Sequence, residues 1–246
     1  MTYLLRASFS GRFFYGTQKQ KGKPTLQGVF EDALEDLYQE KVKVSISSRL
    51  DRGVSAEDFA FSYVPKDSRL SPEKVAYVLS RRLAPEVVIR SAREVEDGFS
   101  VRYGMDYKVY RYALQRKRRP DLNPVAMPVR ENFDFAAYKK AMLLFQGKHD
   151  FRSFSTPEGE EETHLSIDRI TFEEAGDLFY TRIQAQSFLR YQIRFLVGAG
   201  ILAAEGKVSF SLLKDLLEGK EGKYPKDKAW PEGLVLEKIH YPGIDD

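Results

Sequence analysis

The chain has 246 residues, 42% of them hydrophobic and 13% aromatic, which suffices for one sizeable core or two small, closely packed ones. It has no cysteine and three scattered histidines, which excludes disulfides, thiolate nucleophiles and cysteine-ligated metals and makes a zinc site unexpected. The net charge of +3 decides little by itself. No run approaches the roughly 20 apolar residues of a membrane span and the N-terminus lacks a basic leader, so we expect no membrane association and a cytoplasmic protein.

The first part of the chain reads as a βαββαβ unit. Thr25 caps a predicted helix whose apolar residues follow a single stripe, and Ser71 followed by Pro72 begins a second helix. Alternating apolar residues predict four strands, at 3–9, 42–46, 59–63 and 87–89.

The second part repeats that order of elements. Its helices are predicted from about Asp134 to Gly147, over 188–202, and after a cap at Ser209. Its strands are predicted near 107–114, 166–172, 178–185 and 233–239. The fold class is therefore α+β: two ferredoxin-like βαββαβ halves, 1–98 and 99–246, whose sheets can join side by side and leave a central cleft.

Basic residues gather in short clusters near tyrosines. Such clusters suit phosphate contacts combined with base stacking, although a solvated charged face has the same composition, so both interpretations stay open. The clusters comprise Lys19, Lys21 and Lys23; Arg81 and Arg82; and Arg116, Lys117, Arg118 and Arg119.

The loop "SSRLDRGV" joins two predicted strands and carries one aspartate between two arginines. An aspartate near a glycine, as Asp51 is near Gly53, is most often a turn residue. Arg49 and Arg52 nevertheless favour the ionised carboxylate that a nucleophile requires, while a surface ion pair would look the same. The residues alone thus indicate an α+β protein with RNA-binding character and one candidate catalytic aspartate.

Six blocks spread along the chain together resemble one family. "FSGRFFYGTQKQ", "TLQGVFEDAL", "SRLDRGVSA", "FSVRYGMDYKVYRY", "GKHDFRSF" and "FLRYQIRFLVG", followed by "GLVLEKIHYP", are similar in order and spacing to segments of the tRNA pseudouridine synthase A family. Asp51 falls on the catalytic aspartate of that family, Tyr110 on a tyrosine that stacks in the active site, and Arg194 on the arginine that faces the aspartate.

The resemblance implies the pseudouridine synthase fold, whose two α+β halves share a mainly antiparallel sheet, and a homodimer that binds tRNA. It further implies isomerisation of uridine at tRNA positions 38, 39 and 40 in the anticodon arm, without a metal or an organic cofactor. The predicted catalytic residues are Asp51, Tyr110 and Arg194, and the predicted substrate-binding residues are Arg49, Arg52, Gln18, Lys108 and Arg190.

The catalytic loop departs from the family pattern at four positions. Ser48 replaces glycine, Leu50 threonine, Arg52 alanine and Ser55 histidine, and Thr17 replaces a tryptophan outside the loop. Two alternatives follow: a non-catalytic RNA-binding protein on the same scaffold, or a pseudouridine synthase with another RNA target.

Overall fold

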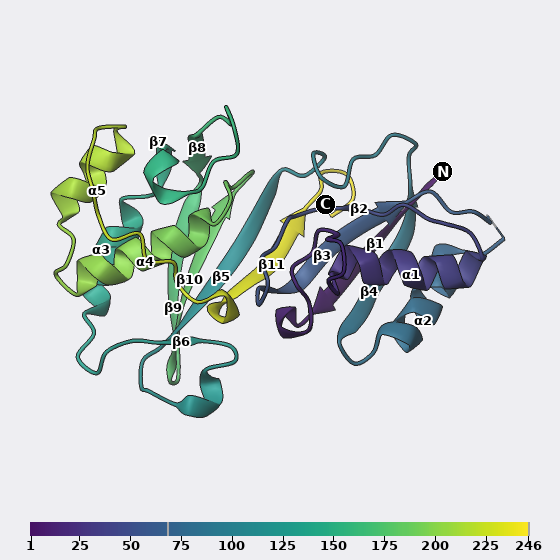
Figure 1. Ribbon diagram of the computed structural model, residues 1–246, viewed down its shortest axis with the longest axis horizontal. Coiled ribbons are helices and arrows are strands. Elements are labelled where there is room, and N and C mark those ends of the chain that lie inside the picture. Colours follow the sequence, from purple (N-terminus) through teal and green to yellow (C-terminus); the bar gives the residue numbers. More distant parts are fainter. Residues whose placement is uncertain (68, 246) are drawn as a thin grey trace. The chain divides into compact units, whose positions relative to one another are not determined.

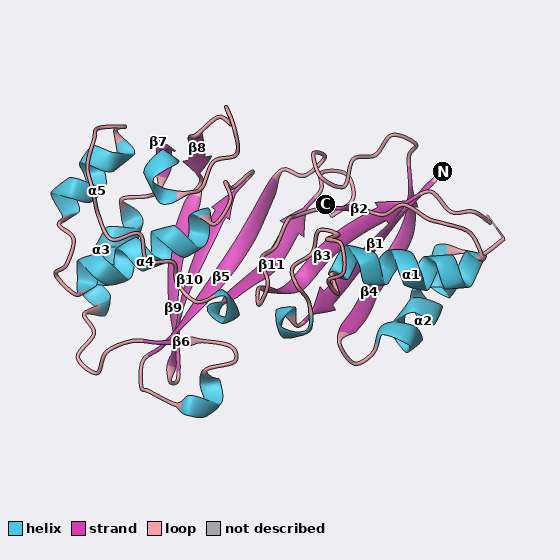
Figure 2. Ribbon diagram, in the orientation of Figure 1, coloured by secondary structure: helices cyan, strands magenta, loops and turns pink. Residues whose placement is uncertain are grey.

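The computed structural model describes residues 1–67 and 69–245 as a mixed α+β protein, as predicted (Figures 1 and 2). Contacts divide the chain into two compact units. The first is Met1–Asp106 with Val235–Asp246, and the second is Tyr107–Leu234. These units differ from the predicted halves in where they place residues 99–106 and the last strand, both of which group with the first unit.

The sheet of the first unit is mainly antiparallel and has the strand order β4-β1-β3. One edge of β3 pairs with two further strands, antiparallel to β2 at Ile46 and Phe61 and parallel to β11 at Leu236 and Ala56. The strands are β1 (Thr2–Phe9), β2 (Ser45–Ile46), β3 (Ser55–Tyr63), β4 (Val87–Val95) and β11 (Leu234–His240).

Two helices, α1 (Leu26–Tyr38) and α2 (Pro72–Leu83), pack on this sheet (Figure 1). The Thr25 and Ser71 side chains cap them, as predicted, by accepting hydrogen bonds from backbone N–H groups of the first turn. Helix α1 buries its apolar stripe against β3, where the Phe30 ring stacks on Phe61 with 3.9 Å between centroids. A short 3-10 helix (Gly11–Phe13) follows β1.

The strand predicted over 42–46 is shorter than expected, because only Ser45–Ile46 pairs with a neighbour. The backbone of Val44 bonds to side chains of α1 instead: its N–H donates to Glu31 Oε1 at 3.2 Å, and its carbonyl accepts from Gln27 Nε2 at 2.8 Å. The alternation of apolar residues over 42–46 therefore reflects burial against α1 rather than pairing in a sheet.

The second unit has the antiparallel order β9-β10-β5, with β6 parallel to β5 and a separate hairpin of β7 and β8. Helix α3 packs against α4, and the Tyr138 hydroxyl on α3 lies 3.1 Å from Thr181 Oγ1 on β10. The strands are β5 (Tyr107–Gln115), β6 (Met127–Pro128), β7 (Gly147–Asp150), β8 (His164–Ile167), β9 (Arg169–Ala175) and β10 (Leu178–Ala185). The helices are α3 (Phe135–Leu143), α4 (Gln192–Ala204) and α5 (Phe210–Leu217), with 3-10 turns at Pro120–Leu122, Arg152–Phe154 and Pro231–Gly233.

Three predicted boundaries in this unit are wrong. Helix α3 ends at Leu143, and Gly147 at φ 106° begins β7 rather than ending the helix. Helix α4 begins only at Gln192, because Tyr191 has the left-handed φ of 62°. The single strand predicted over 166–172 is two strands, which separate at Asp168, whose N–H donates to the Gln184 carbonyl.

Strand β7 ends at Asp150, a buried carboxyl group. Burial by itself raises the pKa of Asp150, but hydrogen bonds from the Arg152 backbone N–H and the Thr163 hydroxyl outweigh it and hold the pKa below its usual value. Asp150 is thus an ionised group that ties β7 to the following turn.

No helix among the described residues is long and apolar enough to cross a membrane.

Candidate active site

The loop of residues 47–54 connects β2 to β3 and is fixed at both ends. At its start, the Ser47 N–H donates to the Ala60 carbonyl at 3.0 Å, and the Ala60 N–H donates to Ser47 Oγ at 3.2 Å. At its end, the Val54 N–H donates to the Asp51 carbonyl at 3.1 Å and closes a turn. Gly53 occupies that turn at φ 88°, a conformation that glycine adopts without steric cost. Asp51 therefore lies in a well-defined turn and is half-buried.

Thr17 holds the middle of the loop from outside. Its hydroxyl donates to the Ser48 carbonyl at 2.9 Å and accepts from the Leu50 N–H at 2.8 Å. Its own N–H donates to the Leu50 carbonyl at 3.1 Å. Thr17 is 1% exposed, so these bonds are shielded from water. A position that appeared in the sequence only as a departure from the family pattern is thus the main support of the loop next to Asp51.

Two glycines allow this close approach of the segments. A Cβ atom on Gly11 would collide with the Val54 carbonyl, and one on Gly16 would lie 2.7 Å from the Leu50 carbonyl oxygen. The Gly53 N–H also donates to the Gly11 carbonyl at 3.3 Å. The segment after β1 therefore acts as a backbone cradle for the loop.

Two cationic side chains near the loop, those of Arg52 and Lys23, lie against the ring of Tyr15. The Arg52 guanidinium lies 4.2 Å from the centroid of the Tyr15 ring, and Lys23 Nζ lies 4.6 Å from it. Arg52 and Arg49 are both exposed. Arg49 also lines a pocket of the first unit together with the exposed Gln18.

In the second unit, Tyr110 lies in the middle of β5. It is 6% exposed, and its ring meets the edge of Phe188 with 5.2 Å between centroids. Lys108 precedes it by two residues on the same face of the strand and is half-buried. This face of β5 therefore presents an aromatic ring and a cation side by side.

Arg194 lies in the first turn of α4, where its Nε donates to the Ala229 carbonyl at 2.8 Å. The Ala229 N–H donates in return to the Arg194 carbonyl at 3.0 Å. The rest of this turn is buried, and an arginine in an apolar helix needs such a partner. The bonds to Ala229 fix the direction in which the guanidinium leaves the helix.

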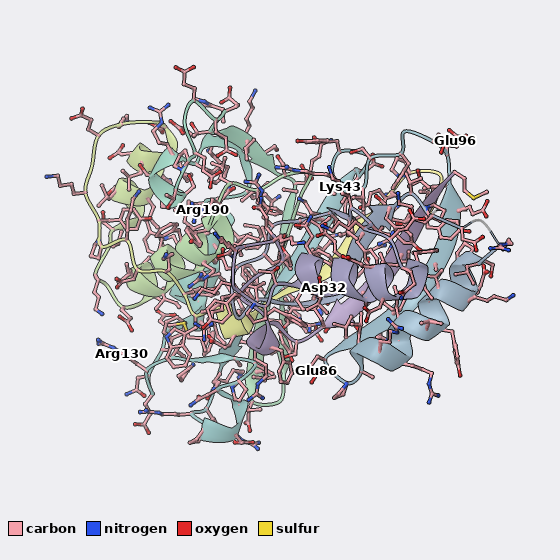
Figure 3. All side chains as sticks on the ribbon, turned by 45° about the vertical axis from the view of Figure 1, so that its right-hand side comes forward. Asp32, Lys43, Glu86, Glu96, Arg130 and Arg190 are labelled. Carbon is pink, nitrogen blue, oxygen red and sulfur yellow. The ribbon has the colours of Figure 1, made fainter. Side chains whose placement is uncertain are left out.

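Tyr191, just before α4, is surrounded by cations. The guanidinium groups of Arg190 and Arg194 lie 4.9 Å and 5.7 Å from its ring centroid, and Lys228 Nζ lies 4.0 Å from it. Arg190, labelled in Figure 3, also pairs with Glu158 at 3.0 Å. Sequence reasoning selected the two arginines but missed Tyr191 and Lys228, since no periodic pattern connects residues 37 positions apart to one ring.

The predicted site residues thus form two sets, each held by its own unit. The first unit positions Gln18, Arg49, Asp51 and Arg52, and the second positions Lys108, Tyr110, Arg190 and Arg194. No group of three or more potential metal ligands occurs among the described residues.

A single carboxylate on a rigid loop, with arginines and tyrosines on both units, is a set of groups suited to an enzyme that acts on a polyanion containing bases. Comparisons with known proteins are specific. A family model described as tRNA pseudouridine synthase matches residues 141–242. The tRNA pseudouridine synthase A of Aquifex aeolicus is 33% identical, over 96% of this chain and 98% of that protein. The enzyme of the same name from Pyrococcus furiosus is 33% identical, over 100% of this chain and 85% of that protein.

The chain therefore belongs to the tRNA pseudouridine synthase A family, a family of isomerases. Among solved structures, an archaeal box H/ACA sRNP Nop10-Cbf5 complex matches with a TM-score of 0.34 and 14% identity, over 77% of this chain and 45% of that one.

Proposed function

We propose that this protein is a tRNA pseudouridine synthase that isomerises uridine at positions 38, 39 and 40 in the anticodon arm. What carries the proposal is Asp51, which by the motif resemblance corresponds to the catalytic aspartate of the family and lies in a loop that Thr17 holds through two hydrogen bonds. The family membership supports the reaction, and the anticodon arm follows from the motif resemblance. By the same resemblance, we propose a cytoplasmic homodimer.

The reaction is an isomerisation that balances without another reactant. The bond between N1 of uracil and C1′ of ribose breaks, and a bond between C5 and C1′ forms. The hydrogen on C5 leaves as a proton, and N1 gains a proton. Asp51 supplies the carboxylate that attacks or stabilises the electron-poor sugar, which requires it to be ionised.

Tyr110 and Arg194 complete the proposed catalytic set. The target uridine must leave its stack, which costs a few kcal/mol, and the Tyr110 ring offers a face that offsets part of that cost. By the family resemblance, in which the corresponding arginine faces the aspartate, we propose that Arg194 favours the ionised state of Asp51. Its bonds to Ala229 hold its head group in one direction before RNA arrives.

The remaining predicted residues bind RNA in this proposal. Arg49, Arg52, Lys108 and Arg190 supply positive charge for phosphates, and Gln18 supplies an amide that donates and accepts hydrogen bonds. Arg52 combines its charge with the ring of Tyr15, at 4.2 Å, which suits a nucleotide that contacts both.

The test is release of tritium from unmodified tRNA transcripts that carry 5-tritiated uridine, with mapping of the product. We expect the wild-type protein to release tritium, and Asp51→Asn to lose release by about 10⁴-fold or more while still binding tRNA. Asp67→Asn, which alters a half-buried loop aspartate paired with Arg69, is the matched control and should release tritium normally.

Each other outcome contradicts a defined part of the proposal. Tight tRNA binding without release by the wild-type protein would identify a non-catalytic RNA-binding protein. Release from another transcript but not from tRNA would identify another RNA target. Pseudouridine at a position outside the anticodon arm would refute only the proposed target positions. Tritium release that survives Asp51→Asn would refute the role of Asp51.

A further inference from the structure

A pocket of about 420 Å³ lies beside the catalytic loop, and all of its walls come from the first unit. This volume falls within the range of pockets that hold small organic ligands. Its walls are the start of α1, the segment that leads into β2, the first residues of the loop, and the turn before β5. The lining residues are Gln18, Gln27, Val44, Ser45, Ile46, Ser48, Arg49, Phe99, Ser100, Val101, Arg102 and Tyr103.

The charge of the pocket favours an anion. Among the described residues that line it, Arg49 and Arg102 are cationic and none carries a carboxylate. A ligand with a phosphate group would meet favourable charge here.

The rim of the pocket carries an aromatic ring that is open to solvent. The Tyr103 side chain is 76% exposed, and the Arg102 guanidinium lies 5.3 Å from its ring centroid. Its backbone N–H donates to Ser100 Oγ at 3.2 Å, which fixes the turn that presents the ring. An exposed tyrosine with a neighbouring arginine is the arrangement on which unstacked bases bind in single-stranded nucleic acid complexes.

The wall of the pocket contains a hydroxyl group without a partner. Ser48 is 6% exposed, and its Oγ has no hydrogen-bond partner in the part of the chain that the structure describes. Leaving a buried polar group unpaired is unfavourable. Its backbone cannot move away, because its carbonyl is held by Thr17. Ser48 also stands where the family motif has glycine, so this hydroxyl distinguishes the chain from the motif.

We propose that this pocket binds one unstacked nucleotide of the RNA substrate, which adjoins the modified uridine in the RNA chain and is distinct from it. The base stacks on Tyr103, its phosphate meets Arg102, and the buried Ser48 hydroxyl turns toward the pocket to pair with a polar edge of the nucleotide. The nucleotide is a different one because Asp51, the proposed catalytic group, is not part of the lining. This inference rests on the proposed function for the choice of RNA, and it adds a second contact by which the enzyme selects its site.

The experiment measures the affinity of an unmodified tRNA transcript for Tyr103→Ala and for a matched control, Tyr77→Ala. Tyr77 is 64% exposed on α2 and has Arg81 at 5.9 Å from its ring, so it reproduces the exposure and the cation without the pocket. We expect Tyr103→Ala to weaken binding by about tenfold or more, whereas Tyr77→Ala stays within about twofold. Ser48→Ala should weaken binding by about two- to tenfold.

A second arm identifies the nucleotide. Transcripts with an abasic residue at either neighbour of the modified uridine are titrated against wild type and Tyr103→Ala. If the pocket holds the base at one of these positions, the abasic residue there and Tyr103→Ala together weaken binding no more than either change does alone. Equal binding by Tyr103→Ala and Tyr77→Ala, or additive losses at both neighbours, would overturn the inference. Tritium release is recorded in parallel. If the protein binds RNA in this way but releases no tritium, the proposed function is refuted while the pocket inference still holds.

Discussion

Replacing Thr17 by valine tests whether the clamp on the catalytic loop positions Asp51. Valine keeps the shape of the side chain but removes the hydroxyl, so the Ser48 carbonyl and the Leu50 N–H both lose a buried partner. Each unpaired buried group costs about 1–3 kcal/mol, so the free energy of unfolding should fall by about 2–6 kcal/mol. Part of the cost disappears if the loop shifts toward water, and that shift would move Asp51.

Activity and stability separate the two effects. A displacement near 1 Å at a reacting group lowers the rate by about a hundredfold, so we expect kcat/KM for tritium release to fall by that order in Thr17→Val. Thr17→Ser, which restores the hydroxyl, should recover most of it. The control is Thr181→Val in the second unit, which loses the bond between Thr181 Oγ1 and Tyr138 but touches no loop residue.

Thr181→Val should lower the free energy of unfolding, measured by urea titration, and leave tritium release unchanged. The reasoning is refuted if Thr17→Val releases tritium as fast as wild type, or if Thr181→Val slows release as much as Thr17→Val does.

Three further predictions follow from the same loop and from the second unit. Gly11→Ala places a methyl group against the Val54 carbonyl, and we expect a loss of about 1–3 kcal/mol in the free energy of unfolding together with reduced release. Arg52→Ala should lower the magnitude of the slope of log affinity for tRNA against log salt concentration by about one, whereas Arg69→Ala should leave that slope unchanged. An unchanged slope for Arg52→Ala would contradict a phosphate contact of Arg52. Because the pKa of Asp150 lies below its usual value, its contribution to stability is full above pH of about 4 and disappears as the pH falls through the lowered pKa. The gap in urea midpoint between wild type and Asp150→Asn should therefore narrow in acid, and a gap that does not change with pH would contradict this assignment.

Local signals in the sequence predicted the helices well. The predicted caps at Thr25, Ser71 and Ser209 are confirmed, because a capping side chain bonds to a backbone N–H only three residues away, and Asp134, where a helix was predicted to begin, caps α3 in the same way. The late start of α4 escaped prediction, since its apolar stripe extends past Tyr191, whose left-handed backbone interrupts the helix. Periodicity reports which face is buried and does not report such a break.

The motif resemblance selects Asp51 as a candidate catalytic residue, and that role stays a prediction. The supports of its loop could not be predicted from the sequence. The hydroxyl of Thr17 contacts Ser48, 31 residues further along the chain, and nothing in the local pattern of either segment indicates that contact. Likewise, the unpaired hydroxyl of Ser48 becomes visible only when every neighbour is known.

The pairing of β11 with β3 has a consequence for the order in which the chain is completed on the ribosome. The first unit includes β11, and Arg6 on β1 contacts both Asp58 and Asp245, so residues made early pair with residues made much later. The second unit is continuous in sequence and emerges complete before then. Domains commonly fold from the N-terminus onward during synthesis, and here the earlier unit still lacks β11 when β5 to β10 of the later unit have been made. During that interval the edge of β3 that later pairs with β11 is open to wrong pairing.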